Sequence, residues 1–555
     1  MKSTNEQLHC IATAKKDKIV VIQASAGVGK TSTLVMIAKE ITQSSIYLAF
    51  NKIAADEAAA KFPCHVTCKT THSVAYAKFG GKLKDKLSRP KGSYVNVAGT
   101  GGEIARFYKI APVFSQGEIA VSAAAVGLFV KTAVQKFEQS ASTTLEVEHV
   151  PTYEIKLLTD KHPFDASVVS NNVLRYARKM WLDRIDLNSP VLATHDTYLK
   201  QWQLSNPVLN YDIIYLDEAQ DTTLCVLDVV MKQKHAKIVL VGDNRQNIYE
   251  WRGSINAMVR IGSDVTQCLL SQSFRYGQAV ADVATRVLNN DVMIKGLPSI
   301  NSVVGDYVVD RTKPYAVLCR TNAYLIDSAI IDLEAGKNVS IEIDVKDFVK
   351  VLESAKELFN GNSAGVKHEK VVPYTTWQDF VEEGKSGGEI GRVASIVANN
   401  RADRMISILK CYVKPENPHI IYTTAHRCKG REFEQVVLGS DFPSNYDNDG
   451  EWCGLAKSEE NLLYVAVTRA ILRLDINSTV REIYEYYDER LPVHAFVEVK
   501  SIEETLNEMI DSDYAIIENN FDFFAVANEY QAKYEKTEIE LRNDNITDEE
   551  FYANF

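Results

Sequence analysis

The chain is built largely from short apolar runs that alternate with stretches of helical spacing. An apolar run of about four to eight residues, bounded by polar or turn residues, is typical of a strand buried inside a parallel sheet. Strands that alternate with helices in this way favour an α/β fold. The runs that we expect to form strands are residues 19–22, 45–50, 66–68, 211–216, 237–241, 315–320, 419–424, 435–438 and 472–476.

Two long stretches interrupt this alternation. Residues 86–190 predict a mainly helical insertion, with helices at 118–137 and 172–183 and a Gly-rich loop at 92–102. The α/β pattern then resumes, and residues 269–275 open a second α/β unit. The chain therefore divides into a first α/β unit, a helical insertion, a second α/β unit, a short helical insertion and a tail, at residues 1–85 with 191–270, 86–190, 271–340 with 411–486, 341–410 and 487–555.

Composition places the chain among ordinary globular proteins. At 555 residues it is too long for one hydrophobic core, and about three to four domain-sized units are expected. No apolar run approaches the roughly 18 residues of a membrane span, and the N-terminus lacks the apolar centre of a signal peptide. Nine scattered cysteines do not suggest a disulfide framework. We expect an intracellular protein, cytoplasmic and nucleoid-associated, or nuclear in a eukaryote.

The formal net charge of −11 argues at first against a nucleic-acid partner. Residues 501–555, however, hold 15 acidic and 3 basic side chains, so the tail alone carries −12. The first 500 residues have a net charge of +1 and can hold a basic groove. The acidic tail could be a folded appendage, a partly disordered segment or a site for a protein partner.

A Gly-rich turn follows the first expected strand and precedes a helix expected at residues 33–41. Its sequence predicts a phosphate-binding P-loop, because backbone N–H groups and the positive helix end would face phosphate charge. A Gly-rich turn without a ligand is the alternative. Ala24 replaces the first glycine of the strict pattern. The loop consists of Ala24, Ser25, Ala26, Gly27, Val28, Gly29, Lys30 and Thr31.

Asp217 and Glu218 follow the apolar run 211–216. In a chain with a P-loop, Asp217 can hold Mg²⁺ opposite Thr31, and Glu218 can position and deprotonate an attacking water. The alternative is a helix N-terminus whose acidic residues act only as caps.

Polar and aromatic side chains also follow other expected strands, where α/β sheets bind ligands. Gln246 could bond a γ-phosphate or the attacking water. Tyr249 and Trp251, beside Arg252, suit base stacking, although aromatic pairs are more often core residues. Phe50 and His72 could contact a nucleic-acid strand or be core and cap residues. Gln7 could read an adenine edge or be a common surface residue.

These residues resemble, in order and spacing, the motif set of superfamily one DNA helicases of the UvrD/Rep type. The resemblance runs from Gln7 to Arg469 and includes DEAQD, VGDNRQNIYEWRG, HRCKGREF and YVAVTRA. Residues 194–207 and 51–76 also resemble the helicase part of the F-box DNA helicases. The chain starts almost at the Gln motif, which leaves no room for an F-box, so a ubiquitin-ligase role is not implied.

The resemblance implies an α/β fold with two RecA-like, P-loop-type parallel-sheet domains and helical insertions. It implies that Gln7 reads adenine, that Phe274 stacks on it, and that Glu432 contacts the ribose. Mg²⁺ would be held by Thr31 and Asp217. The other implied nucleotide-site residues are the P-loop residues with Ser32, Glu218 as general base, Gln246 as γ-phosphate sensor, and Arg275 and Arg469 as arginine fingers. The implied path of single-stranded DNA is lined by Phe50, Asn51, Thr71, His72, Tyr249, Trp251, Arg252 and His426.

From this resemblance we expect an ATP-driven translocase on single-stranded DNA that moves 3′→5′ and unwinds tailed duplexes in repair, recombination or replication. One alternative is a translocase that mainly displaces proteins from DNA with weak unwinding. Another is a nucleotide-dependent binding switch that docks partners through the acidic tail.

Overall fold

The computed structural model describes residues 3–88, 101–116, 118–159, 165–248, 258, 265–372, 374, 376–384, 388–447 and 449–487. All of them belong to one compact unit, Met1–Ala495. The predicted acidic tail lies outside the described residues, except for Tyr487 at its start. No helix within the described ranges is long and apolar enough to cross a membrane.

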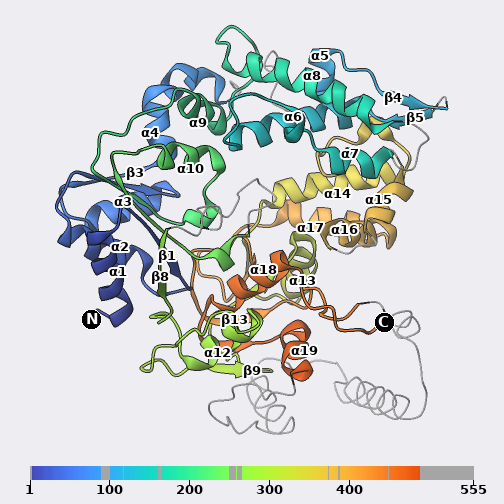
Figure 1. Cartoon of the computed structure of the whole chain (residues 1–555). Coiled ribbons are helices and arrows are strands. Elements are labelled where there is room, and N and C mark those ends of the chain that lie inside the picture. Colours follow the sequence, from blue (N-terminus) through green and yellow to red (C-terminus); the bar gives the residue numbers. More distant parts are fainter. Residues whose placement is uncertain are drawn as a thin grey trace, which may run out of the picture. The chain divides into compact units, whose positions relative to one another are not determined.

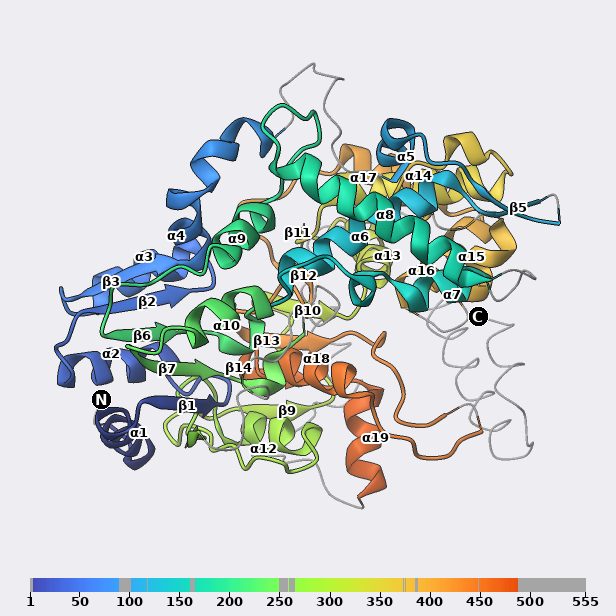
Figure 2. The same cartoon turned by 45° about the horizontal axis from the view of Figure 1, so that its top comes forward.

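Six parallel strands form the first sheet, in the order β3-β2-β6-β7-β1-β8. Figure 2 shows β3, β2, β6 and β7 lying side by side. The strand β8 at one edge was not predicted, and it takes in the first two residues of the run 269–275, which we expected to open the second unit. The strands are β1 Ile19–Ala24, β2 Ser45–Ala49, β3 Val66–Thr70, β6 Ile213–Leu216, β7 Lys237–Gly242 and β8 Thr266–Leu270.

Both faces of the first sheet are covered by helices, as a parallel sheet requires. Val20 and Ile22 of β1 pack in one apolar cluster, whereas Val21 packs in another on the opposite face. The first cluster includes α1 Asn5–Lys16, α2 Lys30–Glu40 and α3 Lys52–Lys61, and the second includes α4 Thr71–Lys78, α9 His195–Leu204 and α10 Leu224–Met231.

A second parallel sheet has the order β11-β12-β10-β13-β14-β9, so the predicted fold of two parallel-sheet α/β units is confirmed. Its short edge strands β9 and β11 were not predicted. The strands are β9 Val303–Gly305, β10 Tyr315–Cys319, β11 Val339–Ile341, β12 Ile420–Thr424, β13 Phe433–Leu438 and β14 Ala470–Asp475.

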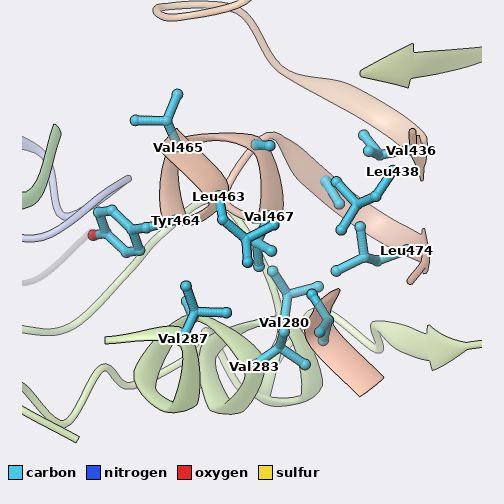
Figure 3. Packing of buried hydrophobic residues seen from close by; sticks show 14 of the residues in the cluster. Val280, Val283, Val287, Val436, Leu438, Leu463, Tyr464, Val465, Val467 and Leu474 are labelled. Atoms are coloured by element: carbon cyan, nitrogen blue, oxygen red, sulfur yellow. The ribbon is translucent and has the colours of Figure 1, made fainter. Parts of the chain in front are cut away.

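One face of the second sheet is covered by α12 and α18. Figure 3 shows Val280 and Val283 of α12 facing Leu463 and Val467 of α18, with Leu474 of β14 alongside. These side chains are fully buried. The helices of this unit are α12 Gln278–Val287, α13 Asn322–Glu334, α18 Lys457–Val467 and α19 Ser478–Tyr486.

Helices dominate both insertions, in Figure 1 as in the sequence prediction. In the first insertion a hairpin, β4 Val113–Ser115 with β5 Glu118–Val121, precedes the main helix. We had expected that helix to start at residue 118, but the Ser122 side chain caps it by accepting a hydrogen bond from the Ala125 N–H. Residues 92–100 of the expected loop lie outside the described ranges. The helices are α5 Gly101–Tyr108, α6 Ala123–Gln139, α7 Thr152–Thr159, α8 Ala166–Ile185, α14 Val345–Phe359, α15 Trp377–Gly384, α16 Gly388–Ala398 and α17 Ala402–Cys411.

Short 3₁₀ turns complete the described structure. They are η1 Gly80–Lys86, η2 Val147–His149, η3 Ala219–Asp221, η4 Asn244–Gln246 and η6 Ser363–Gly365. Two of them, η3 and η4, directly follow β6 and β7, and so lie at the end of the sheet where the candidate site forms.

A buried ion pair inside the first insertion also bonds a helix of the first α/β unit. Arg184 of α8 donates to Glu138 of α6 at 2.7 Å, and both side chains are almost fully buried. Glu138 also accepts from Thr197 of α9 at 2.6 Å. Burial raises the pKa of Glu138, and the Arg184 charge opposes this shift.

We predict that Arg184→Ala lowers the free energy of unfolding by about 3–5 kcal/mol, because Glu138 would be left buried without its partner. Urea unfolding measures the change. Arg178→Ala is the matched control, since Arg178 lies on the same helix and pairs with Glu146 in an exposed position. The control should lose at most about 1 kcal/mol. Equal losses in the two variants would contradict the prediction.

Candidate functional site

The loop between β1 and α2 has the backbone that a phosphate-binding turn needs. Gly27 and Gly29 both have a φ of +76°, a left-handed conformation that favours glycine. Gly29 is the N-cap of α2, and no side chain caps the helix there. The first N–H groups of α2 can therefore face an anion.

The chain segment after β8 lies directly against this loop. The Phe274 N–H donates to the Gly27 carbonyl at 2.8 Å. A Cβ at Gly27 would lie 2.6 Å from the Ser273 Oγ and 2.7 Å from the Arg275 Cβ. Position 27 therefore requires glycine for two reasons: a side chain would clash with these neighbours, and its φ angle is left-handed.

The predicted catalytic residues meet at the carboxyl ends of β1 and β6. The Lys30 Nζ donates to the Glu218 Oε2 at 2.9 Å. The Thr31 Oγ1 donates to the Asp217 Oδ2 at 3.0 Å, and the Tyr47 hydroxyl donates to the same oxygen at 2.5 Å. A lysine, two hydroxyl groups and two adjacent carboxylates thus form one connected group.

Glu218 is held in an unusual backbone conformation. Its φ is +49°, in the left-handed region that few non-glycine residues occupy. Such strain is concentrated at functional sites, where the surrounding structure enforces it. Here the Gln220 side-chain N–H₂ donates to the Glu218 Oε2 at 2.6 Å, and the Glu218 N–H donates to the Asp217 Oδ1 at 2.9 Å.

The charges of the site are closely balanced. Desolvation opposes ionisation of Glu218, but the Lys30 and Lys429 ammonium groups outweigh it and lower its pKa to about 2. Burial and the Glu218 charge raise the pKa of Asp217. Burial acts to lower the pKa of Lys30, but the carboxylates of Glu218, Asp243 and Asp217 outweigh it and raise that pKa. Glu218 is therefore ionised at neutral pH.

Gln246 is held just beyond the end of β7. Its side-chain N–H₂ donates to the Asp243 Oδ2 at 2.7 Å. The backbone carbonyl of Gln246 accepts from the Lys429 Nζ at 2.6 Å, and Lys429 also pairs with the buried Asp221. Burial raises the pKa of Asp221 to about 6. Lys429 belongs to the second unit, so it ties that unit to two turns of the first.

The two predicted arginine fingers lie near each other. The Arg275 Nε donates to the Glu432 Oε1 at 2.7 Å, and its Nη1 donates to the Thr468 carbonyl at 3.1 Å. Arg469 is fully buried and donates to the Val465 carbonyl at 2.9 Å. Burial and the charge of Arg275 lower the pKa of Arg469 to about 10. The bonds of Arg469 described here stay within its own α/β unit.

The residues expected to surround the base converge on Gly29. A Cβ at Gly29 would lie 3.7 Å from the Phe274 ring, 3.7 Å from the Ser32 Cβ and 3.8 Å from the Gln7 Nε2. The Gln7 side chain also donates to Thr33 at 3.2 Å. Residues far apart in the sequence thus approach the same side of the loop.

The expected DNA-contacting residues fall into two groups. Phe50 and Asn51 follow β2, and Thr71 and His72 follow the neighbouring strand β3, so all four lie at one edge of the first sheet. The Phe50 side chain is 52% exposed. Asn51 caps α3 by accepting from the Ala54 N–H, Thr71 is buried, and the His72 Nε2 lies 3.4 Å from Asp196. His426 follows β12 of the second sheet, while Tyr249, Trp251 and Arg252 lie outside the described residues.

Sequence reasoning missed several side chains that bond to the predicted ones, among them Tyr47, Asp243, Lys429 and Tyr464. Asp243 and Lys429 belong to the recognised motifs, so a role in the site could be expected for them. Their bonding partners could not be predicted. Tyr47 and Tyr464 stand inside apolar runs, where a hydroxyl group is the only sign of a polar role.

Comparison with known proteins agrees with this geometry. Residues 7–252 match the model of an AAA domain. F-box DNA helicase protein 1 of Schizosaccharomyces pombe is 28% identical over 514 residues, which cover 84% of this chain and 56% of that protein. F-box DNA helicase 1 of Gallus gallus is 30% identical over 519 residues, which cover 85% of this chain and 48% of the relative. The chain therefore spans about half the length of these curated relatives.

A bacterial helicase matches a shorter part of the chain. ATP-dependent DNA helicase PcrA of Leuconostoc citreum is 26% identical over 114 residues, or 19% of this chain and 15% of that protein. Together, these matches show that the chain is similar over most of its length to F-box DNA helicases and over a shorter stretch to a bacterial DNA helicase.

Proposed function

We propose that this protein is an ATP-dependent DNA helicase that translocates 3′→5′ on single-stranded DNA. The observation that carries the proposal is the connected group of Lys30, Thr31, Asp217 and Glu218 beneath a Gly-rich loop, with Arg275 of the segment after β8 packed against the same loop. A binding switch would not need an ionised carboxylate and an arginine beside the same loop. The direction of movement rests on the resemblance to UvrD/Rep-type proteins.

The residues of the loop fit a nucleoside triphosphate. The uncapped start of α2 and the left-handed glycines suit the phosphates, and Gln7 and Phe274 are close enough to Gly29 to contact a base. The oxygens of Thr31 and Asp217, which are 3.0 Å apart, are the donors that Mg²⁺ prefers. When bound, Mg²⁺ would neutralise charge that develops on the phosphate oxygens.

Glu218 is proposed as the general base. Although burial acts to raise its pKa, Lys30 and Lys429 lower that pKa to about 2, so Glu218 is ionised, and the departure of Lys30 would make it a stronger base for the attacking water. It is engaged by Lys30, whose ammonium group would instead bond the substrate phosphates. When the Lys30 ammonium group bonds the phosphates, the Glu218 carboxylate would be free to orient the attacking water. Gln246 would contact the same water.

The arginines would complete the site from the other α/β unit. Arg275 is already against the loop, while Arg469 is held by carbonyls of its own unit. In the proposed cycle both guanidinium groups stabilise charge on the transferred phosphoryl group, and Glu432, which now pairs with Arg275, contacts the ribose. Hydrolysis would release the arginines and let the two units change their grip on DNA.

Single-stranded DNA would pass over the sheet edge at Phe50, Asn51, Thr71 and His72, and then His426. The exposed Phe50 ring offers a face on which a base can stack without sequence preference. Tyr249, Trp251 and Arg252 are proposed to extend the path. Duplexes with a 3′ or a 5′ single-stranded tail test the direction, since only the 3′-tailed form should be unwound efficiently.

We predict that Glu218→Gln lowers the turnover number for ATP about 10²- to 10⁴-fold, because the general base is lost while the shape is kept. ATP turnover is measured with and without single-stranded DNA. In the wild type, DNA should increase the turnover number strongly. Glu40→Gln is the control, since Glu40 pairs with Lys15 on the surface. Low wild-type turnover that ignores DNA would favour a binding switch instead.

We expect Phe50→Ala to weaken binding of single-stranded DNA by about 1–3 kcal/mol, the usual contribution of one stacked base. Fluorescence anisotropy with a labelled oligonucleotide measures the affinity. Phe114→Ala is the matched control, because Phe114 is 59% exposed but lies on the hairpin of the first insertion. An unchanged affinity in Phe50→Ala would remove Phe50 from the proposed path.

Phosphate contacts should make DNA binding depend steeply on salt, because each neutralised phosphate releases a counterion. We predict that the affinity for single-stranded DNA falls at least about tenfold between about 50 and 200 mM salt. A titration at several salt concentrations gives the slope. An affinity that stays constant over this range would argue strongly against a DNA-bound motor.

A further inference from the structure

The hydroxyl group of Tyr464 lies where the two α/β units meet at the loop. Tyr464 is on α18 of the second unit, and Figure 3 shows its ring leaving the apolar cluster with the hydroxyl oxygen turned toward the blue, N-terminal part of the chain. The hydroxyl oxygen accepts from the Ala26 N–H at 2.9 Å. It donates to the Asp243 Oδ2 at 2.9 Å. Both of its partners belong to the first unit.

These two bonds use the hydroxyl group fully in a dry environment. Tyr464 is completely buried, and Ala26 and Asp243 are 1% exposed. Burial raises the pKa of the Tyr464 hydroxyl far above its usual value, so the group remains a donor. Without the hydroxyl, a buried N–H group and a buried carboxylate oxygen would each lose a partner, which is costly away from water.

On the side of the first unit, the bonds reach the residue proposed to sense the γ-phosphate. The Asp243 oxygen that accepts from Tyr464 also accepts from Gln246 at 2.7 Å. Ala26 is part of the P-loop itself. One hydroxyl group therefore contacts the loop directly and Gln246 through a single carboxylate.

On the side of the second unit, the bonds reach an arginine. The Tyr464 carbonyl accepts from the Thr468 Oγ1 at 2.9 Å, and that oxygen accepts from the Arg469 Nη2 at 3.0 Å. The rest of α18 is fixed in the core by fully buried side chains such as Leu463 and Val467. A close-packed helix moves as a body, and the bonds to Thr468 tie Arg469, just beyond the end of α18, to a displacement of Tyr464.

From this geometry we infer that Tyr464 is a positioning residue that couples the nucleotide loop and Gln246 to Arg469, which follows helix α18. The inference rests on the proposed function and deepens it by assigning the contact through which nucleotide and DNA binding influence each other. Such coupling is reciprocal, so it can be measured from either ligand.

The test compares Tyr464→Phe with Tyr276→Phe in the full chain. Tyr276 is an equally buried tyrosine, and its hydroxyl donates to the Ala26 carbonyl at 3.1 Å, but its bond does not reach Asp243. For each protein, the Kd for a labelled single-stranded oligonucleotide is measured with and without a non-hydrolysable ATP analogue. The ratio of the two values is the coupling, which in many proteins is about 5- to 150-fold.

We predict that Tyr464→Phe moves this ratio at least about threefold toward one, whereas Tyr276→Phe stays within about twofold of the wild type. The DNA-stimulated kcat should fall with the ratio, while the KM for ATP changes by less than about twofold. A purely structural role would lower the melting temperature without this selective loss. If Tyr464→Phe does not fold, Asp243→Asn, which alters the same bond from the first unit, should reduce the ratio in the same way.

Two results would overturn the inference. One is a ratio in Tyr464→Phe that matches the wild type. The other is an equal loss of coupling in Tyr464→Phe and Tyr276→Phe, because any disturbance of Ala26 would then be enough to reduce the coupling. A wild type that fails to bind the oligonucleotide at all would instead defeat the proposed function, and that result is visible before any variant is compared.

Discussion

The ion pair between Lys30 and Glu218 is the interaction on which the rest of the site depends. Asp217 and Glu218 are adjacent carboxylates at the end of one strand, and desolvation would drive both toward the neutral form. The Lys30 ammonium group offsets this cost and keeps Glu218 ionised. Because that stabilisation comes from a residue on the loop, the charge of the acidic pair and the position of the loop are set together.

The parallel sheet explains why residues so distant in the sequence meet. The strands β6, β7 and β1 are adjacent, and their carboxyl ends point the same way. Asp217 follows β6, Asp243 follows β7, and the loop follows β1, so one edge of the sheet gathers the carboxylates and the lysine. The short turns η3 and η4 then hold Asp221 and Gln246 within reach of Lys429 from the second unit.

The sequence was most informative where a buried strand led into a motif. The strands around the P-loop and the acidic pair were predicted almost to the residue, because long apolar runs ended at unmistakable polar signals. The strands β8, β9 and β11 were missed, since β8 alternates exposed with buried residues and the other two span three residues each. Bonds such as those of Tyr47 and Tyr464 could not be predicted, because pairing of a buried hydroxyl depends on which element the fold brings opposite it.

The placement of β1 between β7 and β8 has a consequence for biosynthesis. Its two neighbours are β7 and β8, and residues 25–236 separate β1 from the nearer of them. The ribosome therefore completes the strand that leads into the P-loop long before either partner exists, and the whole first insertion is made in between. Until then both edges of an apolar strand lack their native partners, the state in which nascent chains are most prone to aggregate. The segment that leads into the P-loop therefore stays without a strand partner until residues 237–242 are made.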